Sequence, residues 1–224
     1  MSLPISDDYQ DIRDAVRSLC AEFPDEYHRK VDEKRAYPEE FVDALTQAGW
    51  MAALIPEEYG GVGLGHLELC VVAEELGRVI APVPVASTVY LGAECLLQAG
   101  SEAQKSEWLP KIASGEAIGC WAINEGSGRM KPEKVSVSFD GSTVSGVKAP
   151  VTDGAIADFA IVLAKEGSNL SLCLVDLSGK GVSRTDLDSV DPTRSHASIS
   201  FDGTPATRIG GAGDGWHIAT QVMD

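Results

Sequence analysis

The residues best placed to do chemistry lie in the stretch 118–129, which reads Ile-Gly-Cys-Trp-Ala-Ile-Asn-Glu-Gly-Ser-Gly-Arg. In its apolar part, Cys120 and Ala122 alternate with Trp121 and Ile123, so the run has two apolar faces, as a buried strand does. The stretch then stops in a polar turn. The pattern therefore predicts a buried strand whose end presents polar groups.

The polar end of this stretch admits two interpretations. Asn124 would place an amide at the strand end, and Gly126 and Gly128 would let the backbone turn and come close to a flat or charged group. The same residues also fit an ordinary turn. The segments before residue 118 read as helix and most of those after 129 read as strand. Ligand clefts are common where two kinds of architecture meet, and this position favours a site.

Charge and composition narrow the possible partners. The chain has 224 residues, of which 44% are hydrophobic and 23% charged, with a formal net charge of −16. This composition is ordinary for a globular protein, and the length allows two modest domains. A nucleic acid needs a Lys/Arg footprint that this chain lacks, so we expect no nucleic-acid partner. The same charge argues against an anionic membrane surface, and we expect no membrane partner.

The cysteines and histidines indicate neither a disulfide framework nor a metal site. The five cysteines are odd in number and widely spaced, as free thiols of a reducing compartment are. The four histidines show no metal-ligand spacing, so we expect no bound metal. The sequence has no signal-peptide pattern at its N-terminus and no apolar run of 18 residues. A cytoplasmic location is therefore expected.

Helical periodicity dominates the first half of the chain. The first expected helix ends at Pro24, and the others span 38–48, 66–80, 85–99 and 105–113. Ser-Glu-Ala-Gln at 101–104 resembles a capping sequence before the last of them. The glycine-rich segment 60–65 fits neither GxGxxG nor a P-loop and predicts a structural turn. Helix 85–99 is apolar on most sides, which predicts burial. Its Ser87 and Thr88 could line a cavity, although plain core packing explains the pattern as well.

The second half changes to a period of two residues. Expected strands cover 135–139, 143–147, 160–164, 170–176 and 197–201, with Asp140-Gly141 as a hairpin signal. Short strands at this spacing suggest an antiparallel sandwich or barrel. A further helix starts at Trp216, and its apolar stripe is short for independent stability.

Several segments, taken in order, resemble acyl-CoA dehydrogenases. Residues 56–65 resemble the family's glycine turn, and Glu-Glu-Leu-Gly at 74–77 and the segments 100–110 and 113–116 match in the same order. The resemblance implies an α+β fold, with an all-α helical domain followed by a mainly antiparallel β-barrel domain. The implied domains are 1–116, 117–211 and 212–224, the last being the start of a C-terminal helical domain that is otherwise missing here.

The resemblance also implies an FAD whose ring lies at the junction of the helical and barrel domains. Trp121 and Ile123 match the aromatic and apolar positions of the family's flavin motif, and Thr152 matches a residue near flavin N5. Asn124 stands where the family has threonine, and its amide could donate the same hydrogen bond. We therefore expect Trp121, Ile123, Asn124 and Thr152 to be cofactor contacts. Val85, Thr88 and Val89, on helix 85–90, are the expected acyl-tail wall.

Other positions depart from the family pattern. Gly126 replaces a proline, the nearest match to a Gly-Ser-Asp motif is Ser-Gly-Arg at 127–129, and Pro150 replaces a tryptophan that packs on the flavin ring. Loss of that ring-face contact removes roughly 1 kcal/mol or more. We therefore expect these departures to weaken the binding of FAD.

The activity implied by the resemblance is α,β-dehydrogenation of an acyl-CoA thioester in fatty acid or lipid metabolism (β-oxidation). The partners implied are the acyl-CoA substrate, an electron-transfer flavoprotein or similar acceptor, and further subunits of a homo- or hetero-oligomer. No residue of this chain matches the family's catalytic glutamate, so the fragment itself is expected to be inactive. Two alternatives remain: a degenerate, non-catalytic subunit that partners an active dehydrogenase, and a small acyl-binding protein without a redox role.

Overall fold

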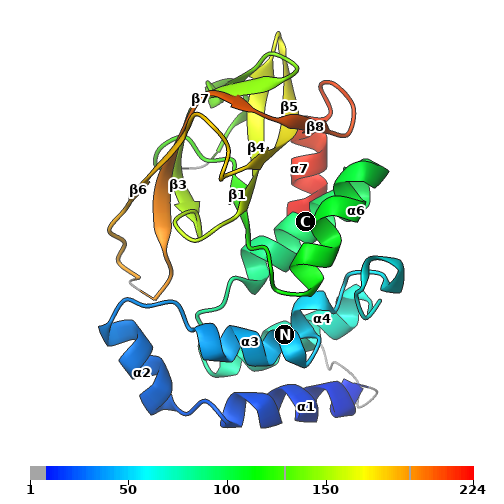
Figure 1. The fold of residues 1–224 in the computed structure, drawn as a ribbon, viewed down its shortest axis with the longest axis vertical. Helices are drawn as coiled ribbons and strands as arrows, with labels where there is room; N and C mark the ends of the chain where they lie inside the picture. The colour runs from blue at the N-terminus through cyan, green and yellow to red at the C-terminus, as the bar shows by residue number, and fades with distance from the viewer. Residues whose placement is uncertain (1–8, 129, 192) are drawn as a thin grey trace.

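The first helices of the chain and the sheet occupy opposite ends of the molecule in the computed structural model, which describes residues 9–128, 130–191 and 193–224 (Figure 1). Most of the helices come first in the chain, the strands follow, and one more helix closes the sequence beside the sheet. The helices are α1 (Gln10–Ala21), α2 (Asp25–Glu33), α3 (Glu39–Gln47), α4 (His66–Arg78), η4 (Ala86–Ala93), α5 (Glu94–Ala99), α6 (Glu102–Ala113) and α7 (Gly215–Met223), with short 3-10 turns η2 (Trp50–Ala52), η3 (Glu57–Tyr59) and η5 (Pro132–Lys134).

Helices α1, α3 and α4 share one apolar core, and a buried charge cluster ties α1 to α4. Glu75 of α4 is 2% exposed and accepts hydrogen bonds from Arg13 and Arg17 of α1. Arg78 lies 3.4 Å from the same carboxylate. Burial acts to raise the pKa of Glu75, but the hydrogen bonds from Arg17 and Arg13 outweigh it and hold the pKa below its usual value. The carboxylate therefore remains charged and clamps the two helices.

Two local predictions for the helical half have clear outcomes. The capping sequence before α6 is confirmed: Gln104 N donates to Ser101 Oγ, and Ser101 N donates to Gln104 Oε1 at 2.9 Å. The single helix expected over 85–99 is instead a π-helix, η4, that continues as α5. Its hydrogen bonds span five residues, as in Glu94 N to Val89 O, so side chains face different directions from those of an α-helix.

The second half forms a curved eight-stranded sheet. The strands are β1 (Gly119–Ala122), β2 (Ser138–Phe139), β3 (Thr143–Thr152), β4 (Phe159–Glu166), β5 (Asn169–Asp176), β6 (Val182–Asp186), β7 (His196–Pro205) and β8 (Thr207–Ile209). The order along the sheet is β6-β7-β3-β2-β4-β5-β8, and β1 pairs with β4. The α+β class and the mainly antiparallel pairing are confirmed, with β1–β4 and β2–β4 as parallel exceptions.

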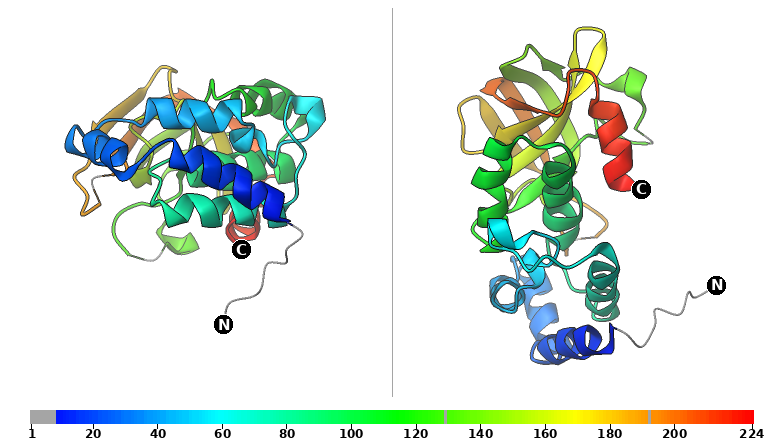
Figure 2. Two further views of the ribbon diagram at one scale, coloured as in Figure 1. Left: turned by 90° about the horizontal axis from the view of Figure 1, so that it is seen from below. Right: turned by 90° about the vertical axis from the view of Figure 1, so that its right-hand side faces the viewer.

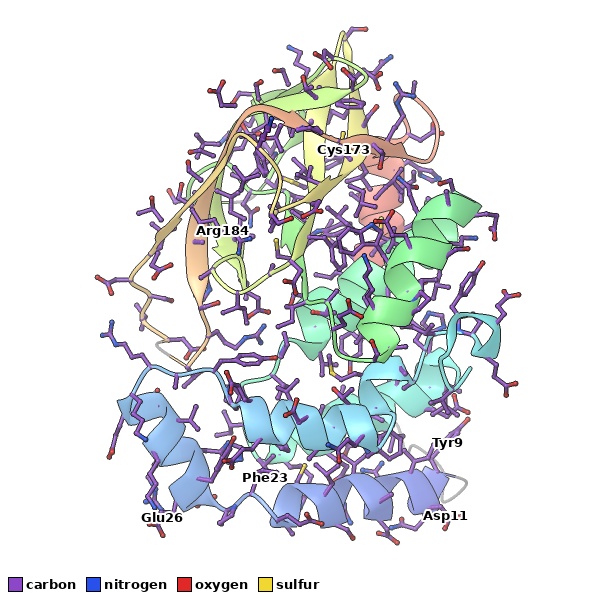
Figure 3. The ribbon with its side chains drawn as sticks, viewed as in Figure 1. Tyr9, Asp11, Phe23, Glu26, Cys173 and Arg184 are labelled. Atoms are coloured by element: carbon purple, nitrogen blue, oxygen red, sulfur yellow. The ribbon has the colours of Figure 1, made fainter. Side chains whose placement is uncertain are left out.

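Strands β6 and β8 were not predicted. β6 reads Val-Ser-Arg-Thr-Asp and has no buried residue, so it lacks the apolar alternation that marks a strand. β8 has three residues, too few for a periodic signal. Arg184 of β6 donates to Ala155 O at 3.1 Å and to Leu177 O at 3.3 Å, which ties this edge to the neighbouring loops (Figure 3).

The sheet has an apolar core on each of its two faces. Cys120 and Ala122 pack in the core enclosed by the sheet, whereas Trp121 and Ile123 pack in the core shared with the helices. The prediction that this run has two apolar faces is thus confirmed. Burial raises the pKa of Cys120, so this thiol stays neutral.

The junction between the two halves lies in the turn after α6. This helix ends at Ala113 and β1 begins at Gly119, so the predicted boundary at 116/117 falls between them. Helix α7 packs against β5, β4 and α5, through Ile218, Ala219 and Val222 (Figure 2). None of the helices within the described ranges is both long and apolar enough to cross a membrane.

Candidate functional site

A cavity of about 620 Å³ lies at the junction of helices and sheet. Trp121, Ile123, Asn124 and Thr152, the residues expected to contact a cofactor, all line it. They come from the end of β1 and the end of β3, which are separate in sequence and adjacent here. The structure therefore brings these four residues together, and their role as cofactor contacts stays a prediction.

Backbone hydrogen bonds hold the ends of β1 and β3 side by side. Ala149 N donates to Asn124 O at 2.9 Å, and Gly126 N donates to Ala149 O at 2.6 Å. Gly126 has a φ of +96°, which lets the chain turn away from the sheet directly after this bridge. The arrangement sets Asn124 next to the segment Pro150–Thr152 on the cavity wall.

A buried ion pair, whose residues do not line this cavity, holds the same end of β1 in place. Lys148 is fully buried, and its Nζ donates to Glu125 Oε1 at 2.7 Å and to Ile123 O at 3.2 Å. Glu125 also accepts from Ser136 N at 2.7 Å and from Val137 N at 3.1 Å. Burial acts to raise the pKa of Glu125, but the hydrogen bonds from Lys148 and Ser136 outweigh it and keep the pKa low. Glu125 thus stays ionised, and its hydrogen bonds stabilise the end of β1.

A second charge cluster lies beside Thr152. Asp153 is 2% exposed and accepts hydrogen bonds from both Nε and Nη2 of Arg194, the Nε bond being 3.1 Å long. Ser87 Oγ of η4 also donates to Asp153. Asp153 has a φ of +59°, in the left-handed region that aspartate tolerates better than most residues. One carboxylate therefore connects the helical half, β3 and the segment before β7.

Sequence analysis missed Asp153 and Arg194 as site residues. Asp153 directly follows Thr152, an expected cofactor contact, and this adjacency was a usable signal. Arg194 is far from it in the chain, and no local pattern joins the two. Arg129, the last residue of the stretch 118–129, lies outside the described residues.

The helix wall of the cavity needs a correction. Val85 and Val89 lie in the core of the helical half, and the Thr88 hydroxyl bonds Gly119 N at 3.1 Å, so none of these three lines the cavity. Ala86, Ser87 and Leu91 line it instead. Residues five apart differ by about 140° on an α-helix, but on a π-helix they form the hydrogen-bonded pair and lie on the same side of the helix, which explains why Ala86 and Leu91 share a face.

Helix α7 supplies a further wall. Trp216, Thr220 and Met223 line the cavity from this side, together with Asp224. The helical walls are thus mostly apolar, while the sheet wall carries the amide of Asn124 and the hydroxyl of Thr152. Such a two-sided cavity suits a flat ligand with one polar edge.

Trp121, which lines the cavity, carries a polar indole N–H. The residue is 9% exposed, yet its indole Nε1 has no hydrogen-bond partner among the described residues. A buried N–H without an acceptor is costly, and bound water or a ligand normally satisfies it. Within the described ranges no three His, Cys, Asp or Glu side chains gather closely enough to hold a metal ion.

The sequence profile described as "Acyl-CoA dehydrogenase, N-terminal domain" matches residues 6–116. The chain belongs to the acyl-CoA dehydrogenase family. The short-chain specific acyl-CoA dehydrogenase of Sus scrofa is 28% identical over 241 residues, covering 100% of this chain and 58% of that protein. The probable acyl-CoA dehydrogenase FadE25 of Mycobacterium tuberculosis is 32% identical over 165 residues, covering 71% of this chain and 42% of that protein.

Solved acyl-CoA dehydrogenase structures share the fold over 97–100% of the chain. A glutaryl-coenzyme A dehydrogenase in complex with glutaryl-CoA superposes with a TM-score of 0.91 at 23% identity, covering 100% of this chain and 61% of that one. An acyl-CoA dehydrogenase of Bacillus anthracis complexed with FAD gives 0.87 at 23% identity, covering 97% of this chain and 40% of that one. Because the chain spans 58% of the pig relative, the activity of the whole protein remains a matter for proposal.

Proposed function

We propose that this chain forms the flavin-binding and acyl-binding part of an FAD-dependent acyl-CoA dehydrogenase that carries out α,β-dehydrogenation of an acyl-CoA thioester. The observation that carries the proposal is the meeting of Trp121, Ile123, Asn124 and Thr152 on one cavity between helices and sheet. Family membership supports it, as does the fold shared with a dehydrogenase complexed with FAD. The volume lies within the usual range for ligand cavities, about 300–1,000 Å³.

The residues present fit a flavin ring. The Asn124 amide and the Thr152 hydroxyl, which make no side-chain hydrogen bond within the described part of the chain, are available to a polar ring edge. Trp121 has a buried N–H without a partner and a ring that can pack on an aromatic system. Pro150 offers a smaller face than the tryptophan of the family pattern, so the remaining contacts must provide more of the affinity.

The apolar walls suit an acyl chain. Leu91 of η4 with Trp216 and Met223 of α7 would exclude water from the carbon atoms that react. Bound FAD would supply the hydride acceptor for the β-hydrogen. Among the described residues on the wall, Asp224 is the one carboxylate, and we assign no catalytic base to this chain. In this proposal the residues of the chain bind and orient, and the α-proton is removed by a group outside them.

The proposal extends to partners and location. The dehydrogenase would pass electrons to an electron-transfer flavoprotein or a similar acceptor, and would assemble as a homo- or hetero-oligomer in fatty acid or lipid metabolism. The five free cysteines, four of them buried, are consistent with a reducing, cytoplasmic location.

Flavin uptake tests the cofactor assignment. The purified 224-residue chain, mixed with a small excess of FAD and passed through a desalting column, is expected to retain flavin absorbance near stoichiometric amounts. Trp121→Phe, which keeps an aromatic ring and removes the N–H, should retain less. A colourless wild-type chain that also fails to quench FAD fluorescence would refute the assignment.

Pro150 and Gly126 favour a second candidate, a non-catalytic subunit that partners an active dehydrogenase. Each of them replaces a family residue on or next to the candidate flavin site. Co-purification with candidate dehydrogenase subunits separates the two functions. The partner function fails if the protein alone binds FAD and reduces an electron acceptor with an acyl-CoA.

A further inference from the structure

Arg194 stands in the wall between two cavities. It lines the 620 Å³ cavity beside Pro150 and Thr152, and also a second cavity of about 420 Å³ between the loop 35–38 and the β6–β7 connection. Its side chain is 21% exposed. Among the described residues on the wall of the larger cavity, it is the one cation.

The carboxylate of Asp153 fixes the orientation of this guanidinium. Two parallel hydrogen bonds, from Nε and from Nη2, hold one edge of the planar group against the carboxylate. The other edge, including both N–H groups of Nη1, has no acceptor among the described residues. A guanidinium cannot lose its proton in a protein, so these donors require an acceptor from water or from a ligand.

The local composition indicates what kind of acceptor would suit. Asp153 compensates the charge of Arg194, so the pair presents directed donors without a strong net field. The neighbouring wall offers Pro150 and the Thr152 hydroxyl, and Pro150 cannot give the ring-face contact of a tryptophan. A guanidinium can both donate to an oxygen and lie against a π-system, which a lysine ammonium cannot do in the same way.

We propose that Arg194 is a flavin-binding residue of this chain, donating a hydrogen bond to an oxygen of the bound flavin, and that Asp153 is its positioning residue. The inference rests on the proposed flavin site and goes beyond the four contacts assigned above. The shared chemistry is an acceptor oxygen, which belongs either to a carbonyl of the ring or to a phosphate of the dinucleotide. The hydrogen bond from Arg194 thereby makes up part of the binding free energy that is lost where Pro150 replaces the tryptophan of the family pattern.

Flavin affinity, measured by fluorescence titration with FAD and with riboflavin, tests this role. Removing Arg194 alone would leave Asp153 buried and unpaired, so the main variant is Asp153→Asn with Arg194→Gln, which replaces the charged pair by two amides. Arg194→Lys keeps the charge and loses the planar fork. Arg35→Gln is the matched control, because Arg35 lines the smaller cavity only and is 72% exposed. Thermal unfolding confirms that each variant is folded.

The double variant is expected to bind FAD about ten-fold to a hundred-fold more weakly than wild type, with Arg194→Lys in between and Arg35→Gln unchanged. A loss seen with both ligands assigns the contact to the ring, and a loss seen with FAD alone assigns it to a phosphate. Equal affinities for wild type and a folded double variant would overturn the role of Arg194 and leave the flavin site standing. A wild-type chain that binds neither ligand would overturn both.

Discussion

Lys148 offers the sharpest test of how the ligand-facing end of β1 is held in place. In Lys148→Met the methylene stem is largely kept, but the Glu125 carboxylate, 11% exposed, loses its cation. Removing one partner of a buried pair costs about 3–5 kcal/mol. Because Ser136 and Val137 still donate to Glu125, we expect a loss near 3 kcal/mol, the lower end of that range.

Urea unfolding at pH 7, followed by tryptophan fluorescence, measures this loss. Lys165→Met is the control, since Lys165 is exposed on β4 and makes no ion pair within the described ranges; it should shift stability by less than about 0.5 kcal/mol. The double variant Glu125→Gln with Lys148→Met should regain at least about 1 kcal/mol relative to the sum of the single losses. A Lys148→Met protein within 1 kcal/mol of wild type, or strictly additive single losses, would refute the reasoning.

The same pair has a pH signature. The pKa of Glu125 lies below its usual 4.5 in the folded protein, because its hydrogen bonds outweigh the effect of burial. Its contribution to stability is therefore present above about pH 4.5 and is lost as the pH falls. In Lys148→Met this acid-side loss should become smaller, since the cation that favours the charged carboxylate is gone.

Two further predictions concern the packing of β1 and of the helical half. Gly119→Ala would push a methyl group into the ring of Phe159 and should cost about 1–3 kcal/mol in thermal or urea unfolding, whereas Gly77→Ala, in open space on α4, should be neutral or stabilising by up to about 1 kcal/mol; similar losses in both would argue against the packing. Glu75→Gln should destabilise the α1–α4 contact by about 3 kcal/mol and speed amide exchange in α1. Because the pKa of Glu75 is low in the folded state, the wild-type protein should lose this stability as the pH falls below about 4.5, and the variant should lack that part of the acid dependence.

Local patterns predicted much of the fold, because they depend on residues close together in sequence. The alternation around Trp121 gave the two faces of β1, and the Ser101–Gln104 spacing gave the cap of α6. The helix expected over 85–99 was placed correctly along the chain, but Val85, Thr88 and Val89, the residues expected on its acyl-facing side, do not line the cavity. This helix has apolar residues on most sides, so its sequence shows no single apolar stripe, and its π-helical geometry could not be predicted.

The parts of the site that sequence reasoning missed depend on contacts between distant segments. Asp153 and Arg194 meet because β3 and β7 pair, with Asp153 N donating to Ser195 O at 2.8 Å at the end of that ladder. Nothing near either residue in sequence indicates the other.

The carboxylate of Asp153 has one further consequence. It accepts hydrogen bonds from a hydroxyl of the helical half and from a guanidinium of the sheet half. The same carboxylate therefore fixes both the packing of the two halves and the orientation of that guanidinium. A small molecule that binds the guanidinium would also stabilise the packing between the two halves. A shift of one half against the other would weaken the binding of that molecule. If Arg194 binds a ligand as proposed, substitutions at Asp153 are therefore expected to change thermal stability and ligand affinity together.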